Sequence, residues 1–296
     1  MSPNNKFPRS EKEFNQWLIG QYFKHGSVDE VLKFHRYDIP ISYANYQRVL
    51  DKWGIVKAVG PNKKMADIVE FLTYFVEKKI PLEMLYKKMP PSFKPSAATL
   101  YRVLSYIKEG ITRRLATGLI ITPHSDKKKV LVARDVSTPR VELGKPYGSI
   151  TIPMGFSKIG DPRKNAILRV LQQEVFTDKA INNSTPSVIP DRTMPFMFLD
   201  IADVRVEVFN ISLPKKLTKI SEFSSFKLSN FRFVDISKKT LVKQTNFRVG
   251  VSEAIAGYKK YLEYKRRNLT FNPLQLKSRI NYRLASEGRF FDEPDI

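Results

Sequence analysis

Residues 149–177 read SITIPMGFSKIGDPRKNAILRVLQQEVFT. The short alternating run at 149–152 predicts a β-strand. Residues 161–176 are expected to form a helix, because apolar side chains recur there at helical spacing. The second half of the chain is therefore expected to fold around a strand, a glycine-containing turn and a helix.

Further strands and a helix are expected on both sides of this unit. The apolar runs at 119–122 and 130–133 are joined by a polar turn, which predicts a β-hairpin. Residues 194–213 are expected to hold more strand, since apolar and charged side chains alternate at 204–209. A last helix at 251–267 ends in basic residues, which suit the negative end of a helix dipole. This order of elements predicts the α+β class.

The stretch from Gly155 onward resembles the Nudix box. That family pattern is Gly, five residues, Glu, seven residues, and then Arg-Glu-apolar-x-Glu-Glu-x-Gly-apolar. Gly155 matches the first Gly, Asp161 stands for the first Glu, and Arg169 and Glu174 match the later Arg and last Glu. The resemblance implies an α/β/α domain with a mixed sheet at roughly 115–267. It also implies a nucleotide-like ligand at Gly155, Asp161, Arg169 and Glu174, although these four residues can equally serve only the turn and the helix surface.

The departures from the family pattern argue against its chemistry. The resemblance implies that Mg²⁺ or Mn²⁺ is held by carboxylates on one face of the helix, but Val170 and Gln173 replace two of them. Divalent cations need several carboxylates or phosphates to offset dehydration, and the family's hydrolysis depends on the metal. We therefore expect no metal, no cofactor and no enzyme activity, and a domain that acts as a ligand sensor or as a scaffold.

A nine-residue motif occurs twice in the first half of the chain. Residues 42–50 read SYANYQRVL and residues 96–104 read SAATLYRVL, so that Ser, Ala, Arg, Val and Leu recur in register. Repetition at a fixed period indicates a duplicated supersecondary unit. A Ser N-cap before a short helix with an exposed Arg is typical of the second helix of a helix-turn-helix. The alternative is a pair of helical hairpins that only packs against the rest of the chain.

The start of such a helix lies in the major groove of DNA, where Asn, Gln and Arg can read bases. Neighbouring basic residues are expected to contact the phosphate backbone. The residues expected to bind nucleic acid are Ser42, Tyr43, Asn45, Gln47, Arg48, Lys63, Lys64, Lys94, Ser96, Thr99, Tyr101, Arg102, Arg113 and Arg114.

Composition and charge agree with a nucleic-acid partner. The 296 residues include 51 Lys and Arg against 29 Asp and Glu, a net charge of +22, and such an excess favours a polyanion through counterion release. Cysteine is absent, which excludes disulfides and Cys-type zinc sites. No apolar run approaches the ~20 residues of a membrane helix. We expect no membrane contact and a cytoplasmic protein associated with the nucleoid or with nucleic acid.

The sequence predicts a DNA-binding transcription regulator with double-stranded DNA as its main partner. The expected parts are two helix-turn-helix units at 1–62 and 63–116, a Nudix-like domain at 117–267 and a C-terminal extension at 268–296. One alternative is an RNA-associated or ribosomal component, because Nudix-like folds also serve in ribonucleoproteins. The other is a Nudix hydrolase whose metal ligands are displaced.

Overall fold

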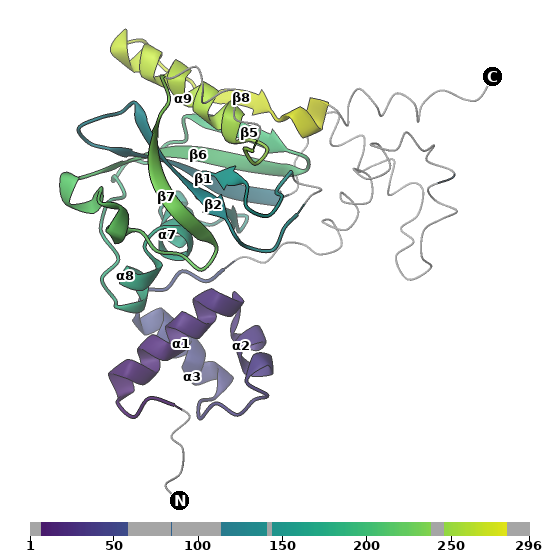
Figure 1. The fold of residues 1–296 in the computed structure, drawn as a ribbon, viewed down its shortest axis with the longest axis vertical. Helices are drawn as coiled ribbons and strands as arrows, with labels where there is room; N and C mark the ends of the chain where they lie inside the picture. The colour runs from purple at the N-terminus through teal and green to yellow at the C-terminus, as the bar shows by residue number, and fades with distance from the viewer. Residues whose placement is uncertain (1–6, 59–83, 85–113, 141–143, 238–245, 283–296) are drawn as a thin grey trace, which may run out of the picture.

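A computed structural model describes residues 7–58, 84, 114–140, 144–237 and 246–282 (Figure 1). The helices are α1 (Glu11–His25), α2 (Val28–Phe34), α3 (Tyr43–Lys52), α7 (Arg163–Glu174), α8 (Thr177–Ile181) and α9 (Val251–Arg266), with 3-10 turns η3 (Lys215–Leu217) and η4 (Ile220–Glu222). The strands are β1 (Arg114–Pro123), β2 (Lys129–Asp135), β3 (Ile150–Thr151), β4 (Met154–Ser157), β5 (Met197–Ile201), β6 (Val204–Leu213), β7 (Leu228–Asp235) and β8 (Leu274–Lys277). The mixed α/β class agrees with the expectation, and no helix of the described part could span a membrane.

Two sheets form the centre of the larger unit. The five-stranded sheet has the order β4-β1-β6-β5-β8, and it is mixed, because β1–β6 and β5–β8 are parallel while β1–β4 and β5–β6 are antiparallel. The three-stranded sheet has the order β3-β2-β7 and is antiparallel. The mixed sheet between helices matches the architecture that the resemblance implies.

Helices α7 and α9 cover opposite faces of β1 (Figure 1). Ala116 and Ile120 of β1 pack in a core with α9, whereas Leu119 and Ile121 pack in a second core with α7. Successive side chains of a strand point to opposite faces, so one strand contributes to both cores. This layering places α7 beside β4, where the glycine-containing turn lies.

The first three helices form a separate core, below α8 in Figure 1. The side chains of Ser10, Ser27 and Ser42 each accept a backbone N–H at 3.2 Å, as N-caps do. Gly26 ends α1 at φ 84°, a left-handed conformation that costs glycine little. Three capped helices are therefore present at the N-terminus, and the cap expected at Ser42 is one of them.

This N-terminal unit is bound to α7 through main-chain groups of 54–58. The side chain of Gln172 accepts the N–H of Val56 at 2.9 Å and donates to the carbonyl of Gly54 at 2.8 Å. Arg169 donates through Nε to the carbonyl of Lys57 at 2.7 Å. Gln172 is 2% exposed, so these bonds lie inside the contact between the two units.

Three details differ from the sequence-based expectations. The runs at 119–122 and 130–133 are strands, but β1 and β2 belong to different sheets and do not pair as a hairpin. Residues 274–277, expected in a C-terminal extension, form β8 and pair with β5. The third difference is β7, because no strand was expected at 228–235. Strand pairing depends on long-range contacts that a local pattern does not contain.

Arg114, expected to contact phosphate, is instead part of a buried ion pair. Its Nε and Nη2 donate to the two carboxylate oxygens of Asp203 at 2.8 and 2.6 Å, and both side chains are buried. A bidentate pair of this kind fixes the start of β1 on the turn between β5 and β6. The guanidinium is therefore not available to a nucleic acid, and this prediction was wrong.

Replacing Arg114 with Met should lower the free energy of unfolding by about 3–5 kcal/mol, because it leaves the Asp203 carboxylate buried without its partner. The measurement is denaturant unfolding of both proteins. The double variant Arg114→Met/Asp203→Asn should lose clearly less of the free energy of unfolding, since it buries no unpaired charge. A single variant as stable as the wild type would show that the pair contributes nothing.

Replacing Gln172 with Leu should loosen the N-terminal unit from α7. We expect amide hydrogen exchange at Val56 to accelerate roughly tenfold, because a lost hydrogen bond is worth about 1 kcal/mol or slightly more. The same change at Gln275, exposed on β8, is the matched control and should leave Val56 unaffected. Unchanged exchange in Gln172→Leu would contradict the contact.

Candidate functional site

A pocket of about 500 Å³ lies where β4 and the end of α7 meet the loops around residues 135–140, 145, 227 and 248. His25, Ser27 and Glu30 of the N-terminal unit also line it. Its walls therefore come from both units of the described chain. This volume is typical of small-molecule sites.

The predicted Nudix-box residues all lie at or beside this pocket. Gly155 on β4 faces the side chain of Val170 on α7, and a Cβ at this position would meet it at 3.4 Å, an ordinary van der Waals contact. Gly155, Arg169 and Glu174 line the pocket. Asp161 forms an ion pair with Arg169. The structure thus brings these four residues together, as the resemblance implies.

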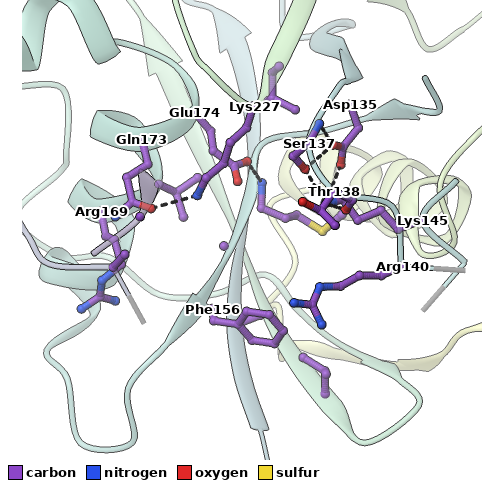
Figure 2. A pocket seen from close by; sticks show the side chains of 18 of the residues that line it. Asp135, Ser137, Thr138, Arg140, Lys145, Phe156, Arg169, Gln173, Glu174 and Lys227 are labelled. Atoms are coloured by element: carbon purple, nitrogen blue, oxygen red, sulfur yellow. Dashed lines mark hydrogen bonds and ion pairs between the residues drawn. The ribbon is translucent and has the colours of Figure 1, made fainter. Parts of the chain in front are cut away.

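Arg169 acts within the protein rather than toward the pocket centre. Its Nε donates to the N-terminal unit and its Nη2 to Asp161. Figure 2 shows its guanidinium pointing away from the space between Lys227 and Phe156. Arg169 and Asp161 therefore position α7, and the surfaces open to a ligand come from other residues.

Glu174 is buried at the end of α7 and faces β4. Its Oε2 accepts the N–H of Met154 at 2.7 Å. Burial raises the pKa of the Glu174 carboxyl, while the charges of Lys227 and Arg248 and the N–H of Met154 act in the opposite direction. Desolvation is the largest of these effects, so the pKa of the Glu174 carboxyl lies above its usual value.

Basic side chains approach the pocket from three loops. Lys145 and Arg248 lie 3.5 and 3.6 Å from Oδ2 of Asp135. Lys227 donates to Oε1 of Gln173 at 3.1 Å, and Figure 2 shows its side chain running between Gln173 and Glu174. Burial lowers the pKa of Lys145, against the opposing effect of Asp135. The pocket is lined by five Lys and Arg residues and three Asp and Glu residues.

The opposite wall is apolar. Phe156 of β4 lies across the pocket from Lys227, and the guanidinium of Arg140 points into the same space (Figure 2). Ala116 of β1 and Val204 and Val206 of β6 extend this wall. Charge on one side and an apolar surface on the other suit a ligand with an anionic part and a flat apolar part.

The residues present do not fit the divalent cation of the Nudix family. The side chain of Val170 has no atom that could bind a metal ion. Gln173 already accepts a hydrogen bond from the ammonium of Lys227, and Glu174 already accepts one from a main-chain N–H. Over the described ranges, no three His, Cys, Asp or Glu side chains are placed to hold a metal ion. Where the family pattern supplies carboxylates, these positions therefore hold a valine, an amide and a single carboxyl group.

Sequence patterns did not indicate Arg140, Lys145, Lys227 or Arg248. They lie far from the box in sequence and share no spacing, and in a chain with net charge +22 each resembles any other surface cation. The fold alone brings them together. One available signal was the position of Lys145 and Arg248 beside glycines, Gly144 and Gly250, that adopt positive φ.

Of the predicted nucleic-acid residues, the described ones other than Arg114 lie at the start of α3, where most of them are exposed. Ser42 caps α3, Tyr43 is exposed, and Arg48 donates to Asn45 at 3.1 Å. Gln47 has a buried Oε1 without a partner among the described residues. The second motif lies outside the described residues. The predicted contacts that fall there are Lys63, Lys64, Lys94, Ser96, Thr99, Tyr101, Arg102 and Arg113.

Comparison with known proteins found likeness in structure alone. No family model matches the sequence, and no curated protein matches it. Similar solved structures include a Nudix hydrolase from Nitrosomonas europaea (14% identity, TM-score 0.38, covering 56% of this chain and 78% of that one). They also include an ADP-ribose pyrophosphatase from Streptococcus suis (14% identity, TM-score 0.36, covering 56% of this chain and 99% of that one). A third is an Ap4A hydrolase from C. elegans (16% identity, TM-score 0.34, covering 51% of this chain and 98% of that one).

These findings correct the main functional prediction. The similar structures named above are Nudix hydrolases, and none of them is a DNA-binding transcription regulator. They are enzymes, so neither that prediction nor the prediction that the chain is not an enzyme finds support among them. None of the structures named above supports helix-turn-helix repeats. The misleading feature was a capped helix with an exposed Arg, which is also how an ordinary surface helix begins.

Proposed function

We propose that the pocket binds a nucleotide-like ligand through its phosphate groups. The observation that carries this proposal is the collection of four basic side chains, Arg140, Lys145, Lys227 and Arg248, around a cavity with an apolar wall. A cavity of this size accommodates a nucleotide rather than a macromolecule. Its walls are main-chain and side-chain groups of a layered fold, so the site is preformed.

The phosphates are expected to lie among Arg140, Lys145, Lys227 and Arg248. Arg248 is largely buried and its Nε has no hydrogen-bond partner among the described residues. A buried donor without a partner is costly, and a phosphate oxygen would satisfy it. Guanidinium groups bind phosphate through paired N–H donors, which fixes orientation as well as charge.

The base or another flat group of the ligand is expected against Phe156. Arg114 lies 5.5 Å from the centre of that ring on one side, and the pocket faces it from the other. An aromatic face next to apolar β1 and β6 side chains offers stacking and desolvation without a specific hydrogen-bond pattern. The walls therefore favour a class of ligand rather than one base.

Replacing Arg140 with Gln should weaken binding of ADP by at least about tenfold, because a charge-assisted hydrogen bond to phosphate contributes roughly 1.5–3 kcal/mol. Isothermal titration calorimetry measures the dissociation constant. Arg134→Gln, an equal change of charge at an exposed position of β2, is the control and should bind as the wild type does. No ADP binding by the wild type, or equal loss in both variants, would contradict the pocket.

A second candidate function is hydrolysis of the bound phosphoanhydride. The observation that favours it is the meeting of Gly155, Asp161, Arg169 and Glu174 at this pocket, in the arrangement that the Nudix resemblance implies. The proteins with similar structures include an ADP-ribose pyrophosphatase and an Ap4A hydrolase. Those two substrates are therefore the first compounds to test.

If the chain is a hydrolase of this kind, incubation with ADP-ribose or Ap4A should release nucleotide products that chromatography detects. Glu174→Gln should then reduce kcat more than it changes KM, because the carboxyl would act on the reacting group and not on ground-state binding. Assays with and without added Mg²⁺ identify any requirement for metal. ADP binding without turnover of either compound would leave ligand binding as the function and reject hydrolysis of these substrates.

A further inference from the structure

Lys227 occupies the side of α7 where the Nudix pattern would place a divalent cation. Gln173 and Glu174 stand at the pattern's paired carboxylate positions, and the Lys227 ammonium donates to Oε1 of Gln173 at 3.1 Å. Its charge also interacts with the Glu174 carboxyl. A positive group of the chain itself is therefore next to both side chains.

The main chain around Lys227 is tied to its neighbours. The Lys227 N–H donates to Oγ of Ser225 at 3.0 Å, and that hydroxyl donates to the carbonyl of Gln173 at 3.0 Å. The Lys227 carbonyl accepts the N–H of Val136 at 2.9 Å. These bonds join the start of β7 to α7 and to the loop after β2, so the ammonium is preorganised and not a surface side chain that happens to reach the pocket.

The charges around this position disfavour an added cation. Lys145 and Arg248 lie on the other side of the pocket, and only Asp135 is within ion-pair distance of both. Burial raises the pKa of the Glu174 carboxyl, so its ionised form is less favoured there than in water. A divalent ion here would be close to three cationic side chains without the carboxylates that offset its dehydration.

We propose that the Lys227 ammonium takes the place of a divalent cation beside α7, so that a phosphorylated ligand binds this pocket without metal. This inference rests on the proposed ligand binding. It assigns to Lys227 the contact with phosphate oxygens that a metal would otherwise make, with Arg248 and Lys145 on the opposite side. Lysine can do this as a point charge with three donors, of which Gln173 uses one.

The test measures binding of ADP and of inorganic pyrophosphate to the full chain by calorimetry, in EDTA and in excess Mg²⁺. We expect binding in EDTA that Mg²⁺ does not strengthen. Lys227→Gln should weaken it by at least about tenfold, the usual minimum for a charged hydrogen bond. Lys260→Gln, an equal change at an exposed position of α9, is the control and should have no effect.

A second variant guards against misfolding, since Lys227→Gln leaves Glu174 with less compensating charge. Glu174→Gln alone keeps an acceptor for the Met154 N–H and serves as the reference for the paired variant. Glu174→Gln/Lys227→Gln should fold, as thermal melting checks, and should lose the same binding as Lys227→Gln.

The outcomes separate the two proposals. The inference is supported if the wild type binds in EDTA and the Glu174→Gln/Lys227→Gln variant does not. Binding that appears only with Mg²⁺ keeps the proposed ligand site and overturns the role of Lys227, as does EDTA-resistant binding that survives the paired variant. Absence of binding in either condition overturns the ligand site itself and the inference with it.

Discussion

The polar face of α7 is the constraint on which the rest of the arrangement depends. One side of this helix packs in an apolar core through residues such as Ile167 and Leu171. The opposite side presents Arg169 and Gln172, while Glu174 lies at the end of the helix near the apolar side, and all three side chains are buried. Buried polar groups must find partners, so whatever lies against this face must offer main-chain donors and acceptors in matching positions. The segment 54–58, the start of β4 and the turn before α7 do so.

This requirement explains why a binding pocket forms where it does. Gln172 and Arg169 hold the N-terminal unit against the helix, which brings His25 and Glu30 to the pocket rim. Glu174 fixes the position of β4 by accepting a hydrogen bond from the N–H of Met154. The same helix therefore fixes the wall contributed by β4, the wall contributed by the N-terminal unit and the loop that carries Lys227.

Much of the local structure was predictable because its causes are local. Serine caps at Ser27 and Ser42 and the left-handed Gly26 mark helix ends through groups within four residues of each other. The box from Gly155 to Glu174 was recognisable because a fixed spacing reflects one strand, one turn and one helix. The pairing of β5 with β8 and the Arg114–Asp203 ion pair join residues about 75 to 90 positions apart, and no local pattern encodes them.

The functional misjudgement has the same physical origin. Net charge was taken as a property of the whole chain, and a strong excess of Lys and Arg does favour polyanions in general. The structure shows that what matters is where individual cations lie and what already binds them. Arg114 is neutralised inside the fold and Arg48 bonds to its own helix, whereas Lys145, Lys227 and Arg248 converge on a cavity of nucleotide size. In such a cavity each charge acts at short range and with little screening. A few converging side chains therefore set the local charge more than the general excess does, and the departures from the Nudix pattern at Val170 and Gln173 change the balance of charge in this pocket.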